Sequence, residues 1–356
     1  MPDYVIDRRG LFALGSAALL SACAPRGALA VRSDLAAPKT QSVWAVAIGA
    51  QRPIAVHSVS EQKTVKLSRF VRHDVSIPPD RKVGQISWPA KRIDPQRDFY
   101  VSDLEQMDDI DAMLDQIATR LKPGQDITVF VHGYNTNYAE AVYRNAQMAH
   151  DFEDDGVHVS IVWPSEASPT GYLTDRDSTL IARDHLERLM LRFVQRFPSR
   201  VVLVGHSMGA FLTMEALRQM SIGGIEIAED LGALVLVSPD IRIDVFQAQV
   251  ARIRQLPDVT VVILSQRDRA LQLSSTLAGG QPRLGSAADI EVLSDMDLLV
   301  IDLSDLPNSG RGNHLAITTS PAAVAFVRGL SSDNPVLQDR RGAGLLVLRV
   351  PLLIPR

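Results

Sequence analysis

From about residue 103 onward, short apolar segments alternate regularly with longer segments whose apolar positions follow helical spacing. The segment 104–121 carries Ile110, Met113, Leu114, Ile117 and Leu121 on one face of a predicted helix. Further helices are predicted over 138–152, 180–197, 208–220, 245–256 and 322–330. Strands are predicted over 43–48, 64–75, 127–131, 157–163, 201–204, 234–237, 259–264 and 298–301.

The predicted strands after residue 103 are nearly all apolar, so neither of their faces is expected to meet water. Such strands, joined by helices, predict a mostly parallel sheet that helices cover on both sides, which is an α/β architecture. Binding and catalytic groups in such sheets gather at the carboxyl ends of the strands. The polar residues that follow each strand are therefore the candidates for function.

The N-terminus has the pattern of an export signal. Arg8 and Arg9 precede the apolar stretch 11–20, which is shorter than the roughly 20 residues needed to span a bilayer. This pattern predicts a twin-arginine signal peptide over residues 1–22. The sequence Leu20-Ser21-Ala22-Cys23 resembles a bacterial lipobox, in which Cys23 would carry the lipid. An exported lipoprotein of the bacterial cell envelope is expected, on the periplasmic side of the outer membrane.

The rest of the chain is predicted to have four parts: a tether over 23–42, a strand-rich N-terminal extension over 43–100, a core over 101–335 and a tail over 336–356. The tail holds short apolar runs broken by Pro351 and Pro355, which favours an edge strand over a membrane-resting helix. Cys23 is the only cysteine, so no internal disulfide is possible. The net charge of −4 disfavours nucleic acid as a partner.

A Gly-x-Ser-x-Gly sequence, Gly205-His206-Ser207-Met208-Gly209, follows one predicted strand and opens a predicted helix. This strand–turn–helix setting is the one in which such a motif exposes a nucleophilic serine. The α/β-hydrolase fold is therefore predicted, with Ser207 as the nucleophile. The alternative is a glycine-rich turn that only starts a helix.

A serine hydroxyl needs a general base, and in this fold the chain order is serine, acid, histidine. Of eight histidines only His314 follows Ser207. Asp268 and Asp240 both follow predicted strands and are the candidate acids. Asp268 is favoured because it lies one strand further along, where the acid usually stands, and the other aspartate would then hold a loop or cap a helix.

The oxyanion hole is expected to consist of two backbone amides. The amide of Met208 directly follows the nucleophile. The amide of Tyr134 belongs to the loop His132-Gly133-Tyr134-Asn135, where Gly133 allows a close backbone approach. His132 is expected to brace this loop, and Asn135 is expected to brace it or to touch substrate, with bracing favoured.

Several motifs together resemble one bacterial family of α/β hydrolases that was long catalogued only as a domain of unknown function. They are Val75–Asp80, Phe130–Asn135, Val162–Ser165, Gly205–Gly209, Ser238–Asp240, Arg267–Leu271 and Asn313–His314. The resemblance extends over roughly residues 70–330. It implies the fold and a triad of Ser207, Asp268 and His314, and it implies no substrate.

The favoured activity is hydrolysis of a small-molecule or lipid-like carboxylic ester through an acyl-enzyme. An acyltransferase using the same intermediate is the near alternative, and a non-catalytic, membrane-anchored binding lipoprotein is the other. No His-Glu-x-x-His motif is present, and neither a metal nor a cofactor is expected. A loop over 165–178 is predicted to line the site, with Tyr172 and Leu173 touching substrate or merely anchoring the loop.

Overall fold

The computed structural model describes residues 27–48, 55–57, 64–66, 69–89, 92–277, 279–287, 290–306, 314–328 and 344–350. The predicted signal peptide over 1–22 and the lipidation site Cys23 lie outside these residues. Across the described ranges, no helix has the length and apolar character needed to cross a membrane.

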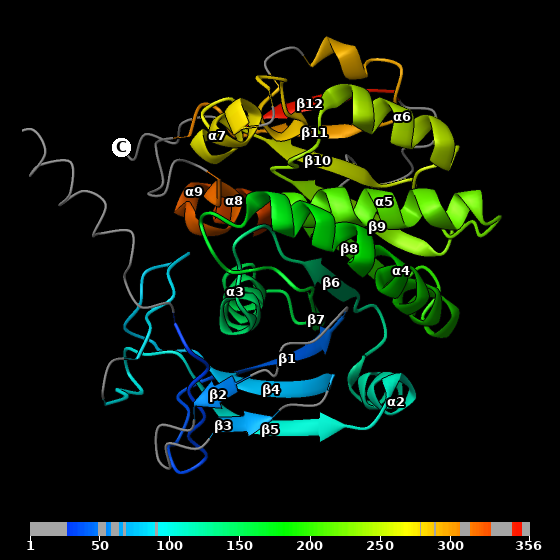
Figure 1. Cartoon of the computed structure of the whole chain (residues 1–356). Helices are drawn as coiled ribbons and strands as arrows, with labels where there is room; N and C mark the ends of the chain where they lie inside the picture. Colours follow the sequence, from blue (N-terminus) through cyan, green and yellow to red (C-terminus); the bar gives the residue numbers. More distant parts are fainter. Residues whose placement is uncertain are drawn as a thin grey trace, which may run out of the picture.

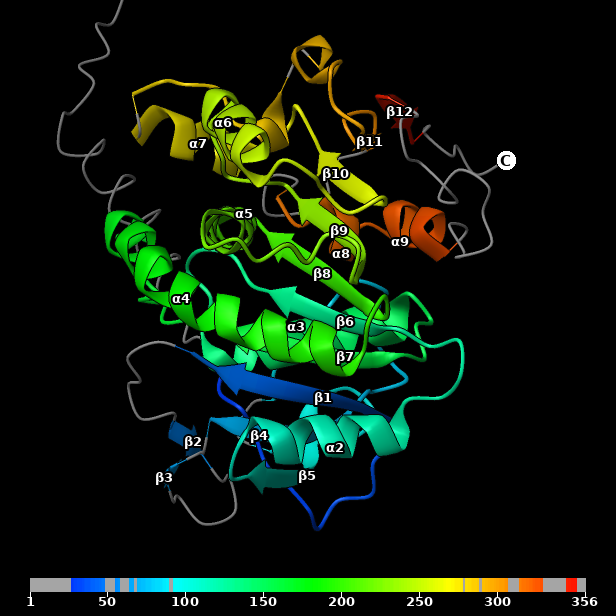
Figure 2. The ribbon, with the colours of Figure 1, turned by 90° about the vertical axis from the view of Figure 1, so that its right-hand side faces the viewer.

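Most of the described strands form a single sheet in the order β12-β11-β10-β9-β8-β6-β7-β1-β4-β5 (Figures 1 and 2). All neighbouring pairs are parallel except those of β4, which is antiparallel to both β1 and β5. The strands are β1 (Thr40–Ala47), β4 (Phe70–Ser76), β5 (Tyr100–Met107), β6 (Ile127–Val131), β7 (Val157–Val162), β8 (Val201–His206), β9 (Leu231–Val237), β10 (Thr260–Leu264), β11 (Leu299–Asp302) and β12 (Leu346–Arg349). A separate antiparallel pair consists of β2 (Ala55–His57) and β3 (Thr64–Lys66).

Helices cover both faces of this sheet, as its apolar strands require (Figure 1). One face packs against α2 (Ile110–Arg120), α4 (Tyr172–Arg196), α5 (Met208–Ile222) and α6 (Ile243–Ile253). The other face packs against α3 (Tyr138–Asp151), α8 (Ala316–Thr319) and α9 (Pro321–Arg328). Helix α7 (Arg269–Leu277) and the 3₁₀ turns η2 (Leu284–Ser286) and η3 (Glu291–Leu293) lie between β10 and β11 in the chain.

Strand β1 contributes buried side chains to the hydrophobic cores on both faces of the sheet. Trp44 and Val46 are buried against the face covered by α2 and α4, whereas Val43 and Ala45 are buried against the face covered by α3. Side chains alternate between the faces of a strand, so a continuous apolar run fills both layers. The predicted α/β class with a mostly parallel sheet is confirmed.

The predicted N-terminal extension is continuous with the core. Strand β1 pairs in parallel with β7, and β5 spans the predicted boundary between residues 100 and 101. The predicted tether is also structured from residue 29, because Leu29 and Ala30 are buried. Val31 forms a parallel bridge with Val101. Strands β1, β4 and β5 therefore widen the main sheet.

Two helix boundaries differ from their predictions. The helix predicted over 104–121 begins only at Ile110, because β5 continues to Met107 and Asp109 caps α2 by accepting from the Ala112 N–H at 2.9 Å. The loop predicted over 165–178 is wrong in its second half, since α4 begins at Tyr172. The predicted edge strand in the tail is present, because β12 pairs with β11 in parallel.

Candidate active site

Ser207 lies at the tight turn between β8 and α5. Its backbone has φ 54° and ψ −120°, a strained conformation for a residue with a side chain. The two motif glycines make this turn possible, because there is no room beside them. A Cβ on Gly205 would lie 2.7 Å from the Ala210 Cα, and a Cβ on Gly209 would lie 2.3 Å from the His132 carbonyl oxygen.

Backbone hydrogen bonds hold this turn in place. The Ser207 N–H donates to the Val237 carbonyl at 2.9 Å, which ties Ser207 to β9. The Ser207 carbonyl accepts from the N–H groups of Ala210 and Asp240, both at 3.1 Å. Such bonds from several segments are what a strained backbone needs in order to persist.

His314 and Asp268 are brought together from separate parts of the chain. The two atoms His314 Nδ1 and Asp268 Oδ2 lie 2.8 Å apart. Asp268 is fully buried at the start of α7 and also accepts from the Leu271 N–H at 3.0 Å. A buried carboxylate at Nδ1 fixes the orientation and tautomer of the imidazole, leaving Nε2 to exchange protons.

His206, directly before Ser207, connects His314 to the turn. The two imidazole rings have centroids 4.8 Å apart. His206 Nε2 lies 3.3 Å from the His314 carbonyl oxygen, and a neutral His206 protonated at Nε2 can donate this hydrogen bond. Burial lowers the pKa of His206 well below its ordinary value, and the nearby His314 lowers it further. His206 is therefore neutral at physiological pH, and His314 is positioned next to the serine-bearing turn.

Asp240, the alternative acid, has a different set of partners. Its carboxylate accepts from the Tyr172 hydroxyl at 2.9 Å and from the Ser274 hydroxyl at 2.6 Å. Arg283 Nε lies 3.2 Å from Asp240 Oδ1, and both side chains are nearly fully buried. The structure thus places His314 beside Asp268 and pairs Asp240 with Arg283.

The loop after β6 lies directly against Ser207. A Cβ on Gly133 would lie 2.9 Å from the Ser207 Cβ and 2.7 Å from His206 Nδ1, so only glycine fits there. The Tyr134 amide follows this contact. Met208 is the first residue of α5, and the first N–H groups of a helix have no carbonyl partner within it. Both predicted oxyanion amides therefore belong to segments that border Ser207.

His132 braces this loop from below. Its ring stacks on Trp163 with centroids 5.0 Å apart, and Nδ1 lies 2.8 Å from the Gly133 carbonyl oxygen. The Trp163 Nε1–H donates to the His132 carbonyl at 2.7 Å. Burial lowers the pKa of His132 to about 4, so this histidine is neutral near pH 7.

Asp175, which the sequence analysis did not single out, joins the two loops on this side of the site. From the first turn of α4 it accepts from the Asn135 N–H at 3.1 Å, the Ser165 hydroxyl at 2.6 Å and the Glu166 N–H at 2.6 Å. Asn135 has a positive φ of 55°, and this hydrogen bond holds it there. No local sequence signal marks this role, because residue 175 falls in the predicted loop over 165–178 and its three partners lie outside α4.

Tyr172 and Leu173 have unlike surroundings. Tyr172 is buried, bonded to Asp240, and packed edge-on against the Tyr134 ring at a centroid distance of 5.5 Å. This is an anchoring arrangement. Leu173 has 73% of its side chain exposed. A contact of either residue with substrate stays a prediction.

No group of three or more His, Cys, Asp or Glu side chains suited to a metal ion occurs among the residues that the structure describes. A search of curated proteins finds no match. Solved structures with similar folds include the ydeN gene product of Bacillus subtilis, with 16% identity and a TM-score of 0.35 over 58% of this chain and 98% of that one. A dienelactone hydrolase from Anabaena variabilis has 17% identity and a TM-score of 0.33 over 78% of this chain and 94% of that one. An esterase from the archaeon Pyrobaculum calidifontis has 10% identity and a TM-score of 0.33 over 59% of this chain and 77% of that one.

These structural likenesses are too weak to inform the chemistry of the site. The family match is more extensive. Residues 108–330 match the family described as "Alpha/beta hydrolase of unknown function", and this range contains β6 to β11 and every residue of the candidate site. The chain therefore belongs to this family of α/β hydrolases.

Proposed function

We propose that this chain is a serine hydrolase that cleaves carboxylic esters through an acyl-enzyme. The observation that supports it is the 2.8 Å contact between His314 Nδ1 and the buried Asp268, next to a serine held in a strained strand–helix turn. A serine in such a turn has a function other than packing, because an ordinary helix start needs no strain.

In the proposed reaction, the Ser207 Oγ attacks the ester carbonyl while His314 Nε2 takes the hydroxyl proton. The oxyanion accepts hydrogen bonds from the amides of Met208 and Tyr134. Collapse expels the alcohol, which receives the proton from His314. A water molecule then attacks the acyl group while His314 takes its proton. The bond between the acyl carbon and Ser207 Oγ breaks, the acid leaves, and His314 returns the proton to Oγ. Asp268 stabilises the imidazolium that forms in each half.

The test is to react the purified protein with a fluorophosphonate, which forms an adduct with activated serines, and to map the adduct. We expect labelling at Ser207 that is lost in Ser207→Ala and reduced by at least about a thousandfold in His314→Ala, because the serine then has no base. His185→Ala on the outer side of α4 is the matched control and should be labelled at the native rate. A folded native protein that stays unlabelled would refute the proposal.

A small-molecule or lipid-like ester remains the proposed substrate class. The cell-envelope location also remains a proposal. It rests on the paired arginines and the lipobox, which precede the described residues.

A further inference from the structure

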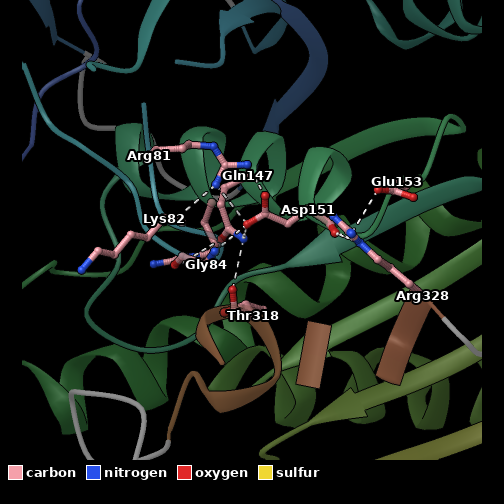
Figure 3. Close-up of polar contacts among 9 residues, drawn as sticks. Arg81, Lys82, Gly84, Gln147, Asp151, Glu153, Thr318 and Arg328 are labelled. Atoms are coloured by element: carbon pink, nitrogen blue, oxygen red, sulfur yellow. Dashed lines mark hydrogen bonds and ion pairs between the residues drawn. The ribbon is translucent and has the colours of Figure 1, made fainter. Parts of the chain in front are cut away.

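A second buried polar cluster lies at the end of α3 (Figure 3). It is centred on Asp151, the last residue of α3, whose side chain is 1% exposed. Its members come from three distant parts of the chain: Arg81 and Gly84, Gln147 and Asp151, and Thr318 on α8. We call these five residues the Asp151 clasp.

The N-terminal part of the clasp binds the Asp151 carboxylate directly. Both terminal nitrogens of Arg81 contact it, one at 3.1 Å, and the Arg81 side chain is only 6% exposed. The Gly84 N–H donates to Asp151 Oδ2 at 2.6 Å. Burial by itself would raise the pKa of Asp151, but Arg81, Gly84 and Gln147 together lower it below its ordinary value. The carboxylate is therefore ionised and paired.

Gln147 extends this network to α8. Its Nε2 donates to Asp151 Oδ2 at 2.7 Å and to the Thr318 carbonyl at 3.1 Å, and the side chain is fully buried. Arg144 donates to Gln147 Oε1 at 2.5 Å and to the Gly84 carbonyl at 3.2 Å. The amide of Gln147 is thus held at both its oxygen and its nitrogen, and Figure 3 shows it between Asp151 and Thr318.

Gly84 also packs directly on α8. It has a positive φ of 81°, and a Cβ there would lie 2.5 Å from the Thr319 Cα. From the other side, Arg328 of α9 donates to the Asp151 carbonyl oxygen at 2.5 Å and pairs with Glu153 at 3.0 Å. The clasp therefore fixes α8 and α9 against the end of α3.

Helix α8 is in turn fastened to the residue after His314. The Leu315 carbonyl oxygen accepts from the N–H groups of Thr318 and Thr319 at 3.0 and 2.9 Å. It also accepts from the hydroxyls of these two threonines at 3.1 and 2.7 Å. A displacement of α8 would therefore move Leu315 and the backbone of His314 with it.

We propose that the Asp151 clasp sets the position of His314, with Gln147 and Arg81 as positioning residues. The inference rests on the proposed function, in which His314 is the base. Arg81 and Gly84 precede the family-matched region, which begins at residue 108. The N-terminal extension is thus part of what orders the active site, although it contributes no group to the chemistry. Buried networks of this kind rigidify a structure only when every member is satisfied.

Two variants test this, Gln147→Met and Arg81→Met. The matched control is Arg72→Met, because the Arg72 side chain is similarly buried at 9% exposure and its guanidinium bonds Asp74, Asp103 and Glu105 on β4 and β5. The first readout is the low-field proton resonance of the N–H shared by His314 and Asp268, assigned by its loss in Asp268→Asn. The second is the rate of Ser207 labelling by the fluorophosphonate.

We expect Gln147→Met to broaden or abolish the resonance and to slow labelling about tenfold, since displacement of a catalytic group by about 1 Å can cost about a hundredfold. Arg81→Met should do the same with a larger loss of thermal stability, and if it fails to fold, Gln147→Met carries the test. Arg72→Met should lower stability and leave both readouts unchanged.

A native-like resonance and labelling rate in Gln147→Met would overturn the proposal, as would equal effects in Arg72→Met or the absence of the resonance from the native protein. If the native protein shows the resonance but no labelling, the proposed hydrolase function fails. The clasp would then still be supported by loss of the resonance in Gln147→Met.

Discussion

Two aspartates follow neighbouring strands of the same sheet and have opposite surroundings. Asp268 after β10 and Asp240 after β9 are both almost completely buried. Asp268 faces the imidazole of His314, whereas Asp240 faces the guanidinium of Arg283 and two hydroxyls. A position after a strand therefore places an aspartate at this end of the sheet, and the residue it contacts determines its chemical role.

The physical difference lies in the proton. An imidazole can gain or lose a proton near neutral pH, so a carboxylate beside it can stabilise a charge that comes and goes. A guanidinium is always charged in proteins, so the carboxylate beside Arg283 belongs to a permanent ion pair. Asp240 additionally donates its backbone N–H to the Ser207 carbonyl, which makes it a support for the turn that carries Ser207.

The largest expected effect is that of Asp268→Asn. The amide cannot stabilise the imidazolium and favours the wrong tautomer, so Ser207 labelling should fall by about 10⁴-fold. The fold should be retained, which circular dichroism would show. Labelling within tenfold of the native rate would contradict the proposal that Asp268, unlike Asp240, stabilises the charged form of His314.

Asp240→Asn should show the reverse pattern. Removing the charge leaves Arg283 buried and unpaired, so the free energy of unfolding should fall by about 3 kcal/mol. Labelling of the folded fraction should fall far less than in Asp268→Asn. Chemical denaturation and labelling of the same sample measure the two effects. A stability loss below about 1 kcal/mol together with a thousandfold loss of labelling would exchange the roles of the two acids.

His132 and His314 also differ in their partners, and the expected effect, on the free energy of unfolding at acidic pH, is smaller. His132 is buried, its Nδ1 lies against the Gly133 carbonyl oxygen, and burial lowers its pKa to about 4. The unfolded chain therefore binds this proton near pH 6.5 while the folded chain does not, so stability is lost as pH falls from about 6.5 to 4.

Phenylalanine keeps the stacking on Trp163 and cannot be protonated. His132→Phe should therefore recover about 1 kcal/mol relative to the native chain between pH 7 and pH 5.5, measured by denaturation at each pH. Parallel curves for the two proteins would show that His132 does not contribute to the acid sensitivity.

Much of this arrangement is predictable from local sequence. Runs such as 127–131 and 201–204 indicate buried parallel strands, and the glycines around Ser207 indicate the tight turn that the structure contains. His314 follows from chain order once the fold is assumed. Each of these inferences depends on residues close together in the chain, where periodicity and steric limits act directly.

The remainder depends on contacts between distant residues. The sequence could rank Asp268 over Asp240 only by fold convention, because the distinguishing partner Arg283 carries no local signal. Gln147 and Thr318, which connect α3 to α8, are 171 residues apart. Tyr172, the first residue of α4, likewise donates its hydroxyl to Asp240, 68 residues away.

Strand β12 has a consequence for handling the protein. It lies at the end of the sheet and pairs in parallel with β11, so it covers a row of backbone donors and acceptors that would otherwise face solvent. An uncovered edge of this kind recruits strands from other molecules. β12 is itself an edge strand, but shortening the chain before Leu346 would move the edge to β11, whose four residues are all buried. A purification tag is therefore better placed where it leaves residues 346–349 free to pair.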